Sequence, residues 1–274
     1  MDIDTVEDVN KSVVRYILGY PKTLALFIVL SLAFEIVCIR GNYSEELMVL
    51  PVLIALLAIF WIQYKTRREF MRQFASRNGY QYRESGEPDE YNWALFDKGH
   101  SKSVFDVVTG TYEGRPIEFF FYKYTEGSGK ESHTYYFTVV KIEYGGAVPS
   151  IVVEKKSVFN TISLARGNQK KLNLGKGFDD YFTVYVPEDF EIETFEIFTP
   201  EIMQMILDRG KEFSFEFIGN KLYVYRQSIT TKRIVLDSFL SFTKDIIATL
   251  GPRLARLHDD VEAIMAATEK TVRY

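Results

Sequence analysis

Two apolar runs near the start of the chain constrain its fold more than any other feature. Residues 24–39 (LALFIVLSLAFEIVCI) contain one acid, Glu35, and residues 47–62 (LMVLPVLIALLAIFWI) contain no charged residue. Each run corresponds to roughly 24 Å of helix, compared with about 30 Å for the hydrocarbon core of a bilayer. We therefore predict a transmembrane hairpin at residues 22–64, with spans at about 22–40 and 46–64.

Aromatic residues extend the reach of these short runs, because amphipathic rings settle at the headgroup level of a membrane. The alternative is a pair of buried core helices in a water-soluble protein. Two such runs separated by only seven residues would need a much larger domain around them, so we favour the hairpin. The flanking aromatic residues are Tyr20, Tyr43, Trp61 and Tyr64.

Lysine and arginine residues predict the orientation of the hairpin, because basic residues stay on the cytoplasmic side during insertion. The short loop between the runs has no basic residue except the bordering Arg40. Both termini are therefore predicted to be cytoplasmic, in a two-span protein of the cell membrane. The basic residues outside the hairpin loop are Lys11, Arg15 and Lys22 before the first run, and Lys65, Arg67, Arg68, Arg72 and Arg77 after the second.

The segments beside the spans also have helical patterns. Residues 1–21 predict a short amphipathic helix that either lies against the inner leaflet or docks onto the soluble domain. Residues 65–79 predict a basic juxtamembrane helix, with a net charge of about +4 over residues 64–77. Two interpretations of this basic segment stay open: its residues only fix the topology, or Lys65, Arg67, Arg68 and Arg72 also bind an anionic lipid headgroup.

From about residue 80 the apolar pattern changes to the two-residue period of β-strands. Residues 115–124 (RPIEFFFYKY) and 133–144 (HTYYFTVVKIEY) are aromatic or aliphatic on both faces, which is typical of strands covered on both sides. Residues 212–226 predict a hairpin with a turn at Gly219 and Asn220. Further strands are predicted at 104–112, 150–154 and 181–187.

Helices are predicted among and after these strands, at 157–165, at 200–209 and from about residue 234. The last is expected to stop or kink at Gly251-Pro252. The predicted fold class is thus α+β, with the transmembrane hairpin followed at 80–274 by a cytoplasmic domain built on a mainly antiparallel sheet with flanking helices.

Several short motifs lie between residues 70 and 250. They are FDKGHSKS at 96–103, VTGTYEGRP at 108–116 with the following Phe-x-Tyr-x-Tyr strand, Phe178-Asp179-x-x-Phe182-x-Val184, Phe198-Thr199-Pro200 and KLYVY at 221–225. These motifs are similar to those of a widespread bacterial family of membrane-anchored proteins with a C-terminal α+β domain of unknown function. The resemblance implies one or two N-terminal spans and this domain, and it brings no catalytic residue or ligand with it.

Composition narrows the classes of function. A net charge of −4 argues against nucleic-acid binding, and a single cysteine, Cys38, excludes a disulfide scaffold and a cysteine-rich zinc module. Gly127-Ser-Gly-Lys130 lacks the first glycine and the Ser/Thr of a phosphate loop and lies between two predicted strands. We predict no cofactor and no metal.

Two groups of polar residues are candidate sites. The first comprises Asp97, His100, Ser101, Ser103 and Asp106, with His133 brought near if its strand pairs beside residues 104–112. An Asp-His-Ser set could activate a hydroxyl group, but a turn capped by Asp97 and Ser101 explains the same residues. Glu35 lies within the first span, where an ionisable group is costly and often functional, although it is near the outer end and could reach the interface.

The sequence predicts no biochemical activity directly. The main hypothesis is a non-enzymatic binding or scaffold module, held at the lipid bilayer and facing a protein partner, a membrane lipid or a second copy of itself. One alternative is a membrane-surface hydrolase centred on His100. The other is an accessory subunit of a membrane complex, in which Glu35 and the short spans contact partner helices.

Overall fold

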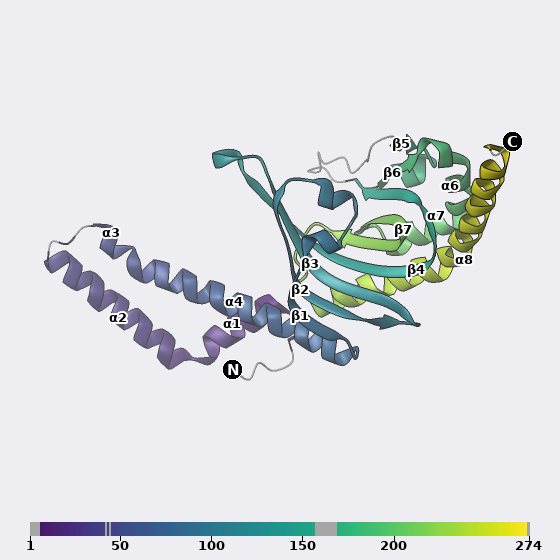
Figure 1. Cartoon of the computed structure of the whole chain (residues 1–274). Helices are drawn as coiled ribbons and strands as arrows, with labels where there is room; N and C mark the ends of the chain where they lie inside the picture. The colour runs from purple at the N-terminus through teal and green to yellow at the C-terminus, as the bar shows by residue number, and fades with distance from the viewer. Residues whose placement is uncertain (1–5, 42, 44, 157–168, 273–274) are drawn as a thin grey trace. The chain divides into compact units, whose positions relative to one another are not determined.

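The computed structural model describes residues 6–272 apart from 42, 44 and 157–168, and it describes 45–46, 146–149, 189, 193 and 254–272 by their backbone alone. The chain forms two compact units (Figure 1). The first comprises Met1–Asn78 with Thr231–Val235, and the second comprises Gly79–Thr230 with Leu236–Tyr274.

The first unit is helical. It contains α1 (Val9–Gly19), α2 (Pro21–Arg40), α3 (Glu45–Met48) and α4 (Leu50–Arg77). Asp8 begins α1, since its carboxylate accepts hydrogen bonds from the backbone N–H groups of Asn10 and Lys11. Pro21 follows at the first position of α2, where its missing N–H costs nothing. From Leu50 onward, the second apolar run and the basic residues after it belong to one continuous helix, α4.

The second unit is built on a seven-stranded sheet in which every strand pair is antiparallel. The path runs β1-β2-β3-β4-β6-β5, and β7 pairs with the other edge of β4. This confirms the predicted α+β class. The strands are β1 (Gln81–Gly86), β2 (His100–Tyr112), β3 (Arg115–Glu126), β4 (His133–Lys155), β5 (Gln169–Leu172), β6 (Phe182–Pro187) and β7 (Ser214–Arg226).

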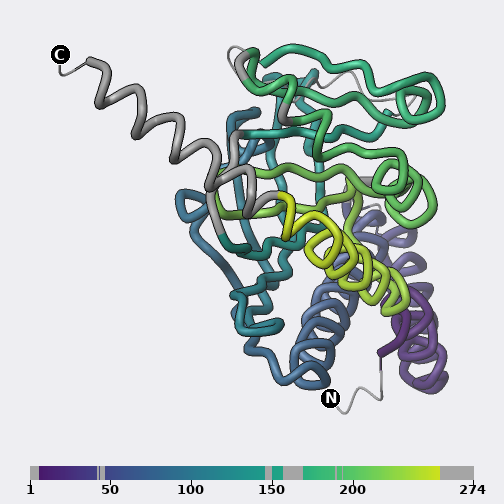
Figure 2. The backbone as a smooth tube through the Cα atoms, turned by 90° about the vertical axis from the view of Figure 1, so that its right-hand side faces the viewer, coloured from purple at the N-terminus to yellow at the C-terminus, as the bar shows by residue number. Residues whose placement is uncertain are grey.

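Both faces of the sheet are covered, as the aromatic pattern predicts. On one face, α8 (Arg233–Val272) contributes Phe239 and Phe242 to a ring cluster with Phe213 and Phe215. Figures 1 and 2 show α8 and α7 (Pro200–Arg209) along this side. The opposite face is covered by the segment that contains η1 (Pro88–Glu90) and η2 (Ala94–Asp97). Its aromatic cluster includes Tyr91, Trp93, Phe96, Phe120, Tyr122, Tyr124, Phe137, Tyr223 and Tyr225.

The predicted hairpin at 212–226 is wrong. Residues 214–226 form one strand, β7, and both of its halves pair with β4. Gly219 adopts a left-handed conformation (φ +55°) without reversing the chain. The register of β4 against β7 shifts on both sides of this point, so that β4 accommodates extra residues opposite it. The Gly-Asn pair therefore marks an irregularity in a long strand pair.

The predictions for helices had mixed outcomes. α7 and the start of the C-terminal helix lie where they were predicted. α8 does not stop at Gly251-Pro252 but continues through the proline, which removes one backbone hydrogen bond without ending the helix. The next residue, Arg253, donates a hydrogen bond of 3.0 Å to the carbonyl oxygen of Glu196. The predicted helix at 157–165 lies outside the described residues. Elements that were not predicted are α3, β1, β5, η1, η2, α5 (Lys176–Asp179), α6 (Glu191–Ile197), η3 (Gly129–Glu131) and η4 (Glu188–Phe190).

A buried carboxylate joins the covering segment to the sheet. Glu216 on β7 is fully buried, and its Oε2 accepts a hydrogen bond of 2.7 Å from the backbone N–H of Ala94 in η2. Its Oε1 accepts from Ser150 Oγ on β4 at 3.2 Å. A buried charge persists only when hydrogen bonds replace its lost hydration. Glu216 therefore helps to fix where the Trp93 segment lies on the sheet.

We predict that Glu216→Ala lowers the free energy of unfolding of the second unit by about 2–3 kcal/mol, because the buried N–H of Ala94 loses its acceptor. Glu216→Gln keeps an acceptor oxygen and should cost less. Glu212→Ala is the matched control, since it removes a surface pair with Lys155 worth about 1 kcal/mol or less. Urea unfolding of the full-length protein in detergent, followed by near-ultraviolet circular dichroism, measures the three variants. Equal losses for Glu216→Ala and Glu212→Ala would contradict the prediction.

Candidate membrane-surface site

The apolar side chains of α2 and α4 lie almost entirely outside the protein interior. Both helices are long and apolar enough to cross a membrane, and only 6% of each apolar stretch is buried. Leu30 on α2 is 60% exposed and Phe60 on α4 is 69% exposed. Exposed apolar surface on this scale marks a membrane or interaction surface. These two candidate membrane-spanning helices support a membrane protein in a lipid environment.

The predicted basic residues follow the apolar part of α4 directly, and three of them lie over aromatic rings. Lys65 Nζ is 4.8 Å from the centre of the Trp61 ring. The guanidinium groups of Arg68 and Arg67 lie 4.4 Å and 5.5 Å from the centre of the Tyr64 ring. Cations over aromatic faces are attracted by the ring quadrupole. Aromatic rings and positive charge thus occur together at the end of the apolar stretch, and Arg72 is exposed one turn further on.

Helix α1 packs against this basic part of α4. Val9 and Val13 are its buried residues. The backbone N–H of Val6 donates to Gln73 Oε1 at 2.7 Å, and Glu7 lies 3.4 Å from Arg77. The other end of α1 leads through Tyr20 into Pro21, the first residue of α2. The start of the first apolar helix and the end of the second apolar stretch are therefore linked through α1.

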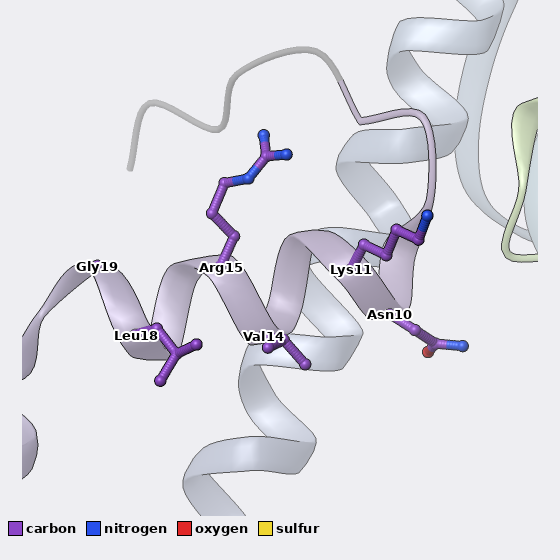
Figure 3. A pocket seen from close by; sticks show the side chains of 6 residues that line it. All are labelled: Asn10, Lys11, Val14, Arg15, Leu18 and Gly19. Carbon is purple, nitrogen blue, oxygen red and sulfur yellow. The ribbon is translucent and has the colours of Figure 1, made fainter.

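An open groove of about 670 Å³ runs along the other side of α1 (Figure 3). The side chains of Lys11 and Arg15 extend from one edge of the helix, and those of Val14 and Leu18 extend from an adjacent side. Both pairs have the four-residue spacing that places side chains on one helix face. Val14 is 56% exposed and Leu18 is 64% exposed. Asn10 and Gly19 complete the lining, and within residues 6–272 as described no acid contributes to it.

Within the first candidate span, Glu35 is half-buried and lies five residues before the end of α2 at Arg40. That distance is roughly 7–8 Å along a helix axis, so the carboxylate lies near the end of the apolar stretch that leads to α3. No described contact assigns it a function.

The histidines of the catalytic hypothesis lie exposed at one end of the sheet. Nδ1 of His100, the first residue of β2, is 3.0 Å from Ser101 Oγ, and Nε2 is 2.9 Å from the carbonyl oxygen of Gly127. Asp97 is exposed at the end of η2, and it is neither of these two partners of the His100 ring nitrogens. His133 begins β4 and pairs with Glu126, whereas His100 pairs with Thr125 on the other edge of β3.

The remaining residues that the sequence suggests for phosphate binding, catalysis or metal binding lie in a loop or are engaged in contacts within the fold. The Gly127–Lys130 segment lies in the loop between β3 and β4, which projects beyond the sheet in Figure 1. Asp106, which the sequence groups with His100, is buried and accepts a hydrogen bond of 2.6 Å from Tyr82. Among the described residues, no three metal-ligating side chains come together.

A buried polar cluster on the Trp93 face of the sheet was not predicted. The hydroxyl groups of Tyr124 and Tyr225 and the indole N–H of Trp93 are buried, and none has a hydrogen-bond partner among the described residues. Two acids share this face, Glu216 and the nearly buried Glu154. A lone acid in the alternating aromatic stretch FSFEF was the available signal. In a strand covered on both sides, such an acid must be buried.

Burial changes the acid–base behaviour of the tyrosines in the second unit. It raises the pKa of Tyr122, Tyr124, Tyr144 and Tyr223 far above the ordinary value of 10.0, and that of the fully buried Tyr225 as well. Tyr91 is raised by burial and also by Glu118, to which its hydroxyl donates at 2.9 Å. The cause is that a phenolate would lose hydration inside the protein.

Comparisons with known proteins add little to this geometry. No family model and no curated protein matches the chain. Among solved structures, the chain is similar to the crystal structure of the mycobacterial trehalose monomycolate transport factor A, TtfA, with 12% sequence identity and a TM-score of 0.49, over 67% of this chain and 96% of that chain.

We predict that the six tyrosines named above for their raised pKa stay protonated in the folded protein when the pH rises past 10. A pKa that is higher in the folded than in the unfolded state contributes stability that is complete below pH 10 and is lost as the pH rises further. Tyrosinate absorbance should therefore increase in two stages, the second coinciding with loss of near-ultraviolet circular dichroism. A single stage near pH 10 in a protein that stays folded would contradict the burial of these hydroxyl groups.

Proposed function

We propose that this chain is a non-enzymatic, membrane-anchored module in which the α2–α4 hairpin tethers the α+β domain to the cytoplasmic face of the cell membrane. The observation that carries the proposal is the exposure of the apolar stretches of α2 and α4, of which only 6% is buried. Apolar side chains in such numbers need hydrocarbon around them. The spans would lie at about 22–40 and 46–64, and both termini in the cytoplasm.

The distribution of charge supports this orientation. Lys11, Arg15 and Lys22 precede the apolar part of α2, and the basic residues of α4 follow its apolar part, whereas the α3 end of the hairpin carries Glu45 and Glu46. Short loops with lysine and arginine stay in the cytoplasm. The contact between α1 and α4 keeps the two basic segments together, as a hairpin with both ends on one side of the membrane requires.

A binding function agrees better than catalysis with the surface of the second unit. Both nitrogens of His100 are already engaged, and His100, Asp97 and His133 are all exposed. General acid–base chemistry usually takes place in a concave, water-restricted site. Ile192 and Phe195, one turn apart on α6, are 76% and 47% exposed and offer an apolar contact for a protein partner or a second copy. As part of the same proposal, the chain is a member of the bacterial family that its motifs resemble.

Cysteine labelling in whole cells tests the topology. In a Cys38→Ala background, we expect Ser44→Cys, in the α2–α3 loop, to react with a membrane-impermeant thiol reagent. Ser128→Cys, in the exposed β3–β4 loop, should react only after the cells are permeabilised.

Two outcomes would count against the proposal. Labelling of Ser128→Cys but not Ser44→Cys in intact cells would reverse the orientation. Equal labelling of both positions before and after permeabilisation, or release of the protein from membranes by alkaline carbonate, would overturn the transmembrane hairpin itself.

A further inference from the structure

Helix α1 has more apolar surface than its contact with α4 uses. Val9 and Val13 are buried, whereas Val14 and Leu18 are 56% and 64% exposed on the groove side. A helix whose apolar residues served only to dock on a neighbour would have one apolar stripe and a polar remainder. The second apolar pair on α1 indicates a second apolar environment.

The charge of the groove indicates what that environment contains. Lys11 and Arg15 are exposed along its edge, and none of the described residues that line it is acidic. Basic side chains beside exposed aliphatic ones are characteristic of helices that lie in the interface of an anionic membrane, where apolar groups enter the acyl region and cations reach phosphates. The long stems of lysine and arginine allow both contacts at once.

The position of α1 in the chain brings this groove to the membrane surface. Only Tyr20 separates α1 from Pro21, where the first candidate span begins. On its other side α1 contacts α4, in which the basic residues start at Lys65, one turn after Trp61. If α2 and α4 cross the bilayer, α1 lies at the level where headgroups meet the acyl chains.

We propose that the α1 groove binds an anionic phospholipid of the adjoining leaflet. Lys11 and Arg15 contact its phosphate-bearing headgroup, and Val14 and Leu18 lie against its upper acyl chain. This inference rests on the proposed function, because it requires α2 and α4 to be in a membrane. It goes further by placing a lipid-binding site on α1, apart from the basic residues of α4.

The test uses the full-length protein reconstituted into nanodiscs of phosphatidylcholine containing phosphatidylglycerol as the anionic lipid. After transfer to mild detergent, native mass spectrometry counts the phosphatidylglycerol molecules that stay bound. Because a basic residue near an anionic surface contributes about a four- to fivefold preference, we expect Lys11→Gln/Arg15→Gln to lower the retention of phosphatidylglycerol by on the order of 10-fold. Val14→Ser/Leu18→Ser should also lower it, without removing charge.

Matched controls separate a site from general attraction between charges. Lys65→Gln/Arg72→Gln removes two exposed charges from α4, and Lys130→Gln/Lys171→Gln removes two from the second unit. Both should retain more phosphatidylglycerol than the α1 variant. Lys11→Arg should bind like the unsubstituted protein. All substituted positions are exposed, and circular dichroism checks that each variant folds.

Three results would overturn the lipid site. Equal retention by the α1 and α4 double variants would show general charge attraction. Unchanged retention in Val14→Ser/Leu18→Ser would show that no acyl contact exists. Displacement of phosphatidylglycerol by millimolar inorganic phosphate would assign the groove to a free anion.

The proposed function fails in a distinguishable way. A protein that does not enter nanodiscs contradicts the transmembrane hairpin. A protein that enters them but retains phosphatidylglycerol no better than phosphatidylcholine contradicts the lipid site alone.

Discussion

The first unit depends on how the exposed apolar side chains of α2 and α4 are covered, and the proposed transmembrane hairpin assigns that cover to hydrocarbon. Within the protein these helices bury almost none of their apolar surface, so they gain little from packing on other parts of the chain. A helix satisfies its own backbone hydrogen bonds, and for that reason it can enter a lipid environment where other backbone conformations cannot. In the proposed hairpin, lipid surrounds the apolar side chains of α2 and α4, as the protein core surrounds apolar side chains in the second unit. The same requirement explains the positions of Trp61, Tyr64 and Lys65, which combine apolar and polar groups where the apolar stretch ends.

In the second unit, apolar side chains are buried by other parts of the protein. β3 buries Phe119 and Phe121 on one face and Phe120, Tyr122 and Tyr124 on the other. Two covering layers are therefore needed, and they differ in kind. Helix α8 covers one face through rings, whereas the segment with η1 and η2 is irregular, and its backbone needs hydrogen-bond partners from the sheet. Glu216 meets part of that need, because its carboxylate accepts a hydrogen bond from the backbone N–H of Ala94. The Tyr91 hydroxyl adds a side-chain hydrogen bond from the segment to Glu118 on β3.

The sequence predicts the parts of the fold that depend on local pattern. The two apolar helices, the alternating strands and α7 follow from hydrophobic periodicity and from proline at a helix start. The prediction of a hairpin at 212–226 is wrong, because Gly-Asn between two alternating stretches also fits an irregular position in one long strand. Only the pairing of both halves with β4 distinguishes the long strand from a hairpin. Strand β1 was not predicted, for a related reason. Its pattern is mostly polar, and its strand conformation comes from pairing with β2.

Candidate sites were harder to predict because they depend on neighbours distant in the sequence. A serine, a histidine and two acids within ten residues suggest chemistry, yet β2 and β3 place His100 against the Gly127 carbonyl on the surface. Glu216 lies between two phenylalanines, and its buried partners come from residues 94 and 150. Lys11 and Arg15 are among the residues that predict the topology. The groove beside them becomes visible only in the folded first unit, where Val9 and Val13 are buried and Val14 and Leu18 stay exposed.

Helix α1 therefore connects the two kinds of burial in the first unit. One side of it is covered by protein, and the other has the mixture of aliphatic and basic side chains that suits a lipid headgroup region. If α1 only docked on α4, exposed leucine and valine beside lysine and arginine would serve no purpose in packing. If α1 only lay on the membrane, Val9 and Val13 would not be buried, and Val6 would not bond to Gln73. In the proposal the helix meets both environments, and its contact with α4 determines which residues remain for the lipid.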